Sequence, residues 1–138
     1  MIRSVRVSRA ATTLAGTLAT YIVCDVLLTP IAGIETRPVA KVTGAGIAVL
    51  GLLFVGLALA ITALALLFRR SPRSPILAIV AAVLYLPAFA AEQTGHFSAV
   101  TAPLGIQRIE FVQAIVAVIA IGLSPWVLRS GITVTTNR

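Results

Sequence analysis

The chain alternates between four long apolar stretches and short polar segments that carry almost all of its charge. The stretches cover residues 10–28, 42–68, 75–91 and 111–128, and Asp25 is the only charged residue inside them. A helix that crosses a bilayer needs about 20 mostly apolar residues. Unpaired backbone groups cannot face lipid, so each stretch is expected to be helical. The pattern therefore predicts an all-α, polytopic membrane protein with four transmembrane helices.

Proline residues support the ends of these spans. Thr29-Pro30 closes the first span, and Ser74-Pro75 opens the third. Because no long soluble segment separates the spans, residues 1–138 are expected to form a single integral membrane domain, a four-helix bundle. A cleaved signal peptide is an alternative interpretation of the first stretch, which is disfavoured because no small-x-small cleavage site follows it.

The composition excludes an ordinary water-soluble domain. Hydrophobic residues make up 59% of the chain and charged residues only 11%, whereas soluble domains average about a quarter charged residues. A disordered chain would be poor in apolar residues, so that class is excluded as well.

The net charge of +7 is divided unequally between the two ends of the predicted bundle. Eight of the 11 basic residues lie on the side of the chain termini: Arg3, Arg6, Arg9, Arg69, Arg70, Arg73, Arg129 and Arg138. Arg37, Lys41 and Arg108 lie on the other side, and the four acidic residues lie towards it. The positive-inside rule then places both termini in the cytoplasm of a multi-pass protein of the plasma (bacterial inner) membrane.

The same distribution argues against nucleic acid as a partner. Arginines near the inner leaflet set topology and contact its anionic lipids. The aromatic residues that a single-strand binder interleaves with its arginines are absent from these segments. The expected partner is the lipid bilayer, together with a second copy of the chain or another membrane protein.

Few residues could form a catalytic or metal-binding set. Cys24 is the only cysteine and His96 the only histidine, so one chain cannot supply a disulfide, a cysteine-rich metal site or two axial haem ligands. No cofactor, metal ion or enzymatic activity is expected.

Asp25 is the most informative residue of the sequence. It lies 15 residues after Ala10, or about 22 Å along a helix, which is still inside the hydrocarbon core. An aspartate at the centre of a membrane helix costs about 2.5–3.5 kcal/mol, so it usually has a partner in the bundle. Arg108 and Gln113 are the candidates. Asp25 is then either a proton- or cation-linked carboxylate or a structural contact that joins two helices.

Other polar residues are expected near the same side of the membrane. They form a candidate outer-side polar cluster: Asp25, Glu92, His96, Arg108, Glu110 and Gln113. Small residues at a spacing of four predict helix packing, in a tight bundle or between copies, although an alanine-rich chain also produces such stripes by chance. They are Thr12, Gly16, Thr20 and Cys24 in the first span, and Gly56 and Ala60 in the second.

The segment Tyr21-Ile22-Val23-Cys24-Asp25-Val26-Leu27 and the pair Ile109-Glu110 carry a resemblance to known proteins. In size and layout the chain resembles small bacterial four-span membrane proteins, including DoxX-like proteins. This resemblance implies no established activity.

Three functions are therefore considered. The first, which the absence of a complete catalytic or cofactor set favours, is a non-enzymatic four-helix accessory or interaction module. The second is a small oligomeric transporter or channel that uses Asp25. A less favoured third is a quinone- or lipid-handling enzyme that uses Glu92 and His96.

Overall fold

A computed structural model describes residues 9–130, which form four long helices. The helices are α1 (Arg9–Leu28), α2 (Gly44–Phe68), α3 (Ser74–Gln93) and α4 (Leu104–Ser130). Each is long and apolar enough to span a membrane, so the predicted all-α class and the four candidate spans are confirmed. Arg3, Arg6 and Arg138, which contributed to the charge asymmetry, lie outside the described residues.

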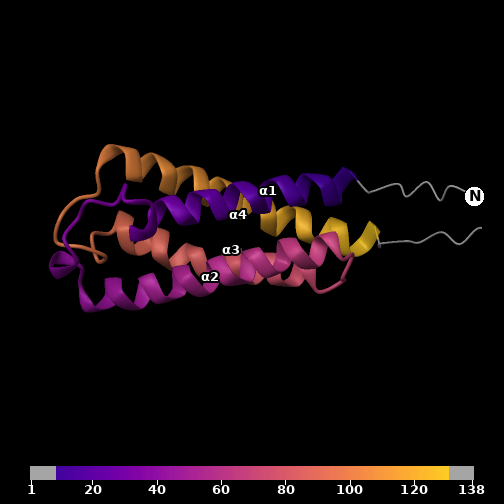
Figure 1. The fold of residues 1–138 in the computed structure, drawn as a ribbon, viewed down its shortest axis with the longest axis horizontal. Helices are drawn as coiled ribbons and strands as arrows, with labels where there is room; N and C mark the ends of the chain where they lie inside the picture. The colour runs from indigo at the N-terminus through magenta and orange to yellow at the C-terminus, as the bar shows by residue number, and fades with distance from the viewer. Residues whose placement is uncertain (1–8, 131–138) are drawn as a thin grey trace, which may run out of the picture.

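The four helices run up and down in chain order around a common axis (Figure 1). Each one packs on its neighbours in the sequence, and α4 packs back on α1 to close the ring. Helices of 20–27 residues are about 30–40 Å long, which matches the thickness of a bilayer. We call the end with residues 29–43 and 94–103 the loop end, and the end with residues 69–73 the terminal end.

Many small side chains pack in the interior, beside larger buried ones such as Leu14, Leu18 and Ile106. Ala60, Ala63, Ala78, Ala117 and Ala120 are at most 1% exposed. Branched and aromatic side chains cover the outside of the bundle: Val23, Ile47, Phe54, Val55, Ile61, Phe68, Ile115, Val118 and Trp126. Because lipid tails solvate such side chains well, close packing of small residues is what brings membrane helices together.

Helix α4 begins earlier than the sequence predicts. The apolar stretch starts at residue 111, but the helix starts at Leu104, directly after Pro103. The amide of Gln107 donates to the carbonyl oxygen of Ala102 at 2.7 Å and ties this first turn to the preceding loop. Hydropathy detects only the apolar part of a helix, so the polar first turns of α4, which carry Arg108 and Glu110, lie before the predicted span.

The two loop-end segments are joined by backbone hydrogen bonds. The N–H of Thr43 donates to the carbonyl oxygen of Phe97 at 3.0 Å, and the N–H of Ala99 donates to that of Lys41 at 2.9 Å. Thr43 also caps α2, since its hydroxyl accepts the N–H of Gly46 at 2.9 Å. The loop end is therefore a closed cap with a defined structure.

Gly46 is required by this cap, and Gly46→Ala is expected to lower the free energy of unfolding by about 1–3 kcal/mol. A Cβ at this position would collide with the backbone carbonyl of Phe97 and lie 2.7 Å from Cγ1 of Val42. Thermal unfolding in detergent measures the effect. Gly51→Ala is the matched control, because nothing lies within 4 Å of its added Cβ. Equal stability of the two variants would contradict the described cap.

Candidate functional site

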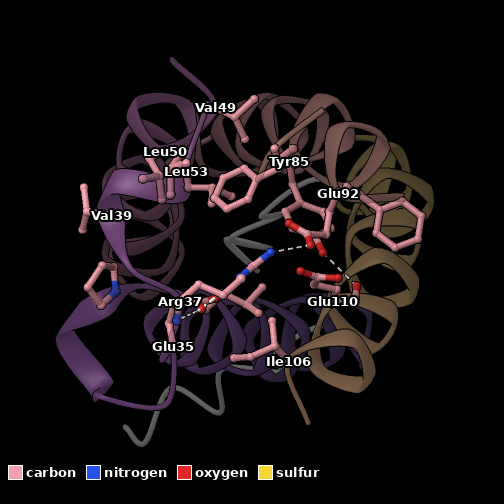
Figure 2. A pocket seen from close by; sticks show the side chains of 16 residues that line it. Glu35, Arg37, Val39, Val49, Leu50, Leu53, Tyr85, Glu92, Ile106 and Glu110 are labelled. Atoms are coloured by element: carbon pink, nitrogen blue, oxygen red, sulfur yellow. Dashed lines mark hydrogen bonds and ion pairs between the residues drawn. The ribbon is translucent and has the colours of Figure 1, made fainter. Parts of the chain in front are cut away.

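A charged network occupies the loop end of the bundle. Arg37 comes from the loop between α1 and α2, and its side chain points towards the bundle axis (Figure 2). Its guanidinium bonds to Glu35 at 2.8 Å and to Glu92 of α3 at 2.6 Å. The plane of the Phe97 ring lies beneath it, with the guanidinium carbon 5.0 Å from the ring centroid. Only 4% of the Arg37 side chain is exposed, so this is a buried ion pair.

Glu35 and Arg37 lie in a loop outside the four candidate spans, and the pKa values of both side chains are shifted. Burial by itself raises the pKa of Glu35, but the hydrogen bonds and charge of Arg37 outweigh burial and bring it below its usual 4.5. Burial likewise opposes the charge of Arg37, whereas its hydrogen bonds to Glu35 and Glu92 give a net rise of its pKa. Both groups therefore stay charged at neutral pH.

This pairing predicts how stability depends on pH. A carboxyl whose pKa is lowered by folding stabilises the folded state above its unfolded value of 4.5, and that contribution disappears as pH falls through the lower folded value. We expect the Tm in detergent to fall when the pH is lowered below about 4.5. Glu35→Gln should have a flatter profile in this range, and an unchanged profile would show that Glu35 does not contribute.

A second polar group lies deeper, between α1 and α4. Asp25 and Gln113 are completely buried and lie within electrostatic reach of each other. None of their side-chain oxygens or nitrogens meets hydrogen-bond geometry, nor does Oε2 of Glu110, one turn of α4 closer to the loop end. Gln113 is thus the neighbour of Asp25 that the sequence suggested, but the structure does not join the two side chains by a hydrogen bond.

Two buried tyrosines, Tyr21 and Tyr85, lie near these polar side chains. The hydroxyl of Tyr85 donates to the backbone carbonyl of Glu110 at 2.8 Å. That of Tyr21 donates to the carbonyl of Ala81 at 2.9 Å and so joins α1 to α3. Their rings meet edge to face, with centroids 6.2 Å apart. Both hydroxyls are therefore committed to backbone acceptors.

A cavity of about 60 Å³ opens between the charged network and Tyr85. Its polar lining comes from Glu35, Arg37, Glu92 and Glu110, which Figure 2 shows around the same space. Its apolar lining includes Leu28, Leu53, Phe89 and Ile106. A cavity of this volume accommodates a few non-hydrogen atoms.

The predicted outer-side polar cluster is divided by the structure. Glu92 and Glu110 line the cavity, and Asp25 and Gln113 lie in the bundle interior. His96 and Arg108 are exposed and do not line it. Nδ1 of His96 lies 2.9 Å from the hydroxyl oxygen of Thr94. Among residues 9–130 the structure gives Arg108 no ion pair, so Arg108 is not the partner of Asp25.

Sequence reasoning missed Arg37 and Glu35 as site residues and used Arg37 only for topology. The sequence signal for this pair was the placement of two opposite charges, Glu35 and Arg37, two residues apart in a short apolar loop. That spacing does not indicate that the side chain of Arg37 enters the bundle.

The predicted packing residues also divide into two sets. Cys24, Gly56 and Ala60 face the interior. Thr12, Gly16 and Thr20 are exposed, and nothing lies within 4 Å of a Cβ added to Gly16. The interior face of α1 instead consists mainly of larger side chains, with Leu14, Leu18 and Tyr21 buried.

Within the described residues 9–130, no group of three or more histidine, cysteine, aspartate or glutamate residues is arranged to hold a metal ion. Comparisons of the chain with protein-family models, curated proteins and solved structures find no match.

Proposed function

We propose that this protein is a small membrane transport protein in which Asp25 binds a proton or a small cation. The observation that supports the proposal is the complete burial of the Asp25 carboxyl group, which forms no hydrogen bond or ion pair within residues 9–130. An ionised carboxylate in such surroundings is costly unless a proton or a cation compensates its charge. Gln113 beside it can donate to the ionised form or accept from the protonated form.

The acidic and amide side chains of the interior near Asp25 lie on its loop-end side. Glu110 lines the cavity at that end, and Gln113 lies one turn further along the same face of α4. Beyond Tyr21, towards the terminal end, the interior holds apolar side chains such as Leu14 and Leu18, and the buried hydroxyls of Ser74 and Ser124 donate to backbone carbonyls. Transport therefore requires a second conformation or an oligomer, in line with the proposed small oligomeric transporter.

The orientation belongs to the same proposal. Five described arginines lie at the terminal end of the bundle: Arg9, Arg69, Arg70, Arg73 and Arg129. By the positive-inside rule this end is cytoplasmic, and the cavity faces the exterior of a bacterial inner membrane.

Asp25→Asn is expected to abolish proton- or cation-coupled flux in proteoliposomes while leaving assembly intact. Asparagine keeps the size of aspartate but cannot carry its charge or take up its proton. An entrapped pH indicator measures proton flux, and size-exclusion chromatography checks assembly. His96→Ala is the control, because His96 is exposed and lies outside the cavity. Loss of assembly, with no measurable flux in the wild-type protein, would indicate a structural role and reject the proposal.

A non-enzymatic interaction module is the second candidate, and one face of α1 favours it. Gly16 and Thr20 are exposed at a spacing of four, and the hydroxyl of Thr20 donates to the carbonyl of Gly16 at 3.0 Å. Faces of small residues allow membrane helices to approach closely. Native mass spectrometry after mild detergent extraction should then detect a homo-oligomer or a partner that Gly16→Leu removes. A wild-type protein that is only monomeric and unaccompanied would reject this candidate.

A further inference from the structure

We propose that the loop-end cavity binds a small monocationic organic amine, with the carboxylate of Glu110 as its anionic partner. This site is separate from Asp25, which does not line the cavity. It therefore goes beyond the proposed transport function and can be tested independently of it.

The charges around the cavity leave room for one more cation. Three lining carboxylates, those of Glu35, Glu92 and Glu110, face a single cationic side chain, that of Arg37. Arg37 bonds directly to the first two only. Glu110 is 6% exposed, and its Oε2 has no hydrogen-bond partner. A buried carboxylate without a partner is the group that a bound cation would satisfy.

The walls of the cavity favour an organic cation over a metal ion. Hard metal ions require several oxygen ligands, and residues 9–130 contain no group of side chains arranged to supply them. Instead, Tyr85 and Phe89 place aromatic rings at the cavity, with centroids 6.2 Å apart. Aromatic faces attract alkylammonium groups, and aliphatic walls accept their carbon atoms.

The side chain of Arg37 shows how this end of the bundle accommodates an organic cation. The guanidinium of Arg37 is held by two carboxylates and lies over the ring of Phe97. An anionic ligand is disfavoured, because Arg37 is the only cationic side chain among the described residues that line the cavity, and two carboxylates already neutralise its charge. The remaining volume of about 60 Å³ restricts the ligand to a few non-hydrogen atoms.

The experiment measures binding of ethylammonium to the full chain in detergent at pH 7 by ligand-observed NMR. Alkylamines have pKa values close to that of lysine, so the probe is charged. Three non-hydrogen atoms limit its affinity, and a Kd on the order of 1 mM is expected. Ethanol serves as the uncharged probe of equal size and should bind at least about tenfold more weakly, since it lacks the charge.

Three variants test the assignment. Glu110→Gln should weaken ethylammonium binding at least about tenfold by removing the anionic partner. Ala88→Val, which adds two methyl groups to the cavity wall, should block binding while Glu110 remains. His96→Ala, which changes an exposed residue outside the cavity, should bind as the wild-type protein does. If Glu110→Gln does not fold, Ala88→Val still decides the outcome.

Several results would overturn the proposal: no saturable binding, equal binding of ethanol, competition by equimolar Na⁺, or unchanged binding in Glu110→Gln or Ala88→Val. Weakened binding in His96→Ala would also overturn it, because the loss would then not be specific to the cavity. Failure of ethylammonium to bind leaves the flux prediction for Asp25 unaffected. Loss of flux in Asp25→Asn, in turn, would not show that the cavity binds an amine.

Discussion

Replacing Arg37 by methionine is expected to lower the free energy of unfolding by about 3–5 kcal/mol. The substitution removes the cation that bonds to Glu35 and Glu92 and leaves both carboxylates uncompensated beside Glu110. A large part of the loss is the cost of the remaining buried charges rather than the strength of the pair itself. Thermal or denaturant unfolding in detergent, followed by circular dichroism, measures it.

Two further variants separate this explanation from a general loss of basic charge. Arg108→Met, at an exposed position of the same end, should change stability by no more than about 0.5 kcal/mol. The triple variant Arg37→Met, Glu35→Gln, Glu92→Gln should recover much of the loss, because no uncompensated carboxylate remains in the network. If Arg37→Met were as stable as Arg108→Met, Arg37 would not form the buried pair in the folded protein.

Gly56→Val is expected to cost about 2–4 kcal/mol, whereas Gly56→Ala should be tolerated. A Cβ at Gly56 would lie 3.5 Å from the hydroxyl of Tyr21 and 3.6 Å from the carbonyl oxygen of Ala81, which is ordinary contact. The two further methyl groups of valine would reach the 2.9 Å hydrogen bond that joins these groups. The cost then combines overpacking with the loss of a buried hydrogen bond.

The matched control for this position is Gly51→Val. Gly51 lies on the exposed side of the same helix, and nothing lies within 4 Å of an added Cβ. It should unfold at nearly the wild-type denaturant concentration. A graded loss at Gly56, with alanine close to wild type and valine far below it, would confirm the close approach of α1, α2 and α3 at this level. Equal effects of valine at both positions would contradict it.

The helices were predictable because hydropathy and helix length are local properties. The predicted spans 10–28, 42–68 and 75–91 agree with α1, α2 and α3 to within a few residues. The fourth was predicted too short, since its first turns carry Gln107, Arg108 and Glu110. A polar turn at the end of a helix does not raise the local hydropathy, so a hydropathy pattern does not detect it.

The candidate site was predictable only in part. Asp25 was identified because a charge inside an apolar stretch is costly, and Gln113 because it lies near the same side of the membrane. Arg108 was chosen by the same reasoning and proved to be exposed. Which face of α4 points inward depends on its rotation against α1, and apolar residues occur on every face of a membrane helix.

The amino-acid sequence alone determined that the chain forms four helices able to span a membrane, and it placed most of the basic residues at one end. Backbone hydrogen bonding in lipid leaves no alternative to helices for such long apolar stretches. Only the tertiary structure decided that Arg37 enters the bundle, that Glu92 and Glu110 share a cavity, and that Thr12, Gly16 and Thr20 face outward. These features depend on contacts between residues far apart in the chain. Since the outer surface of the bundle is as apolar as its core, hydrophobicity does not indicate which residues make them.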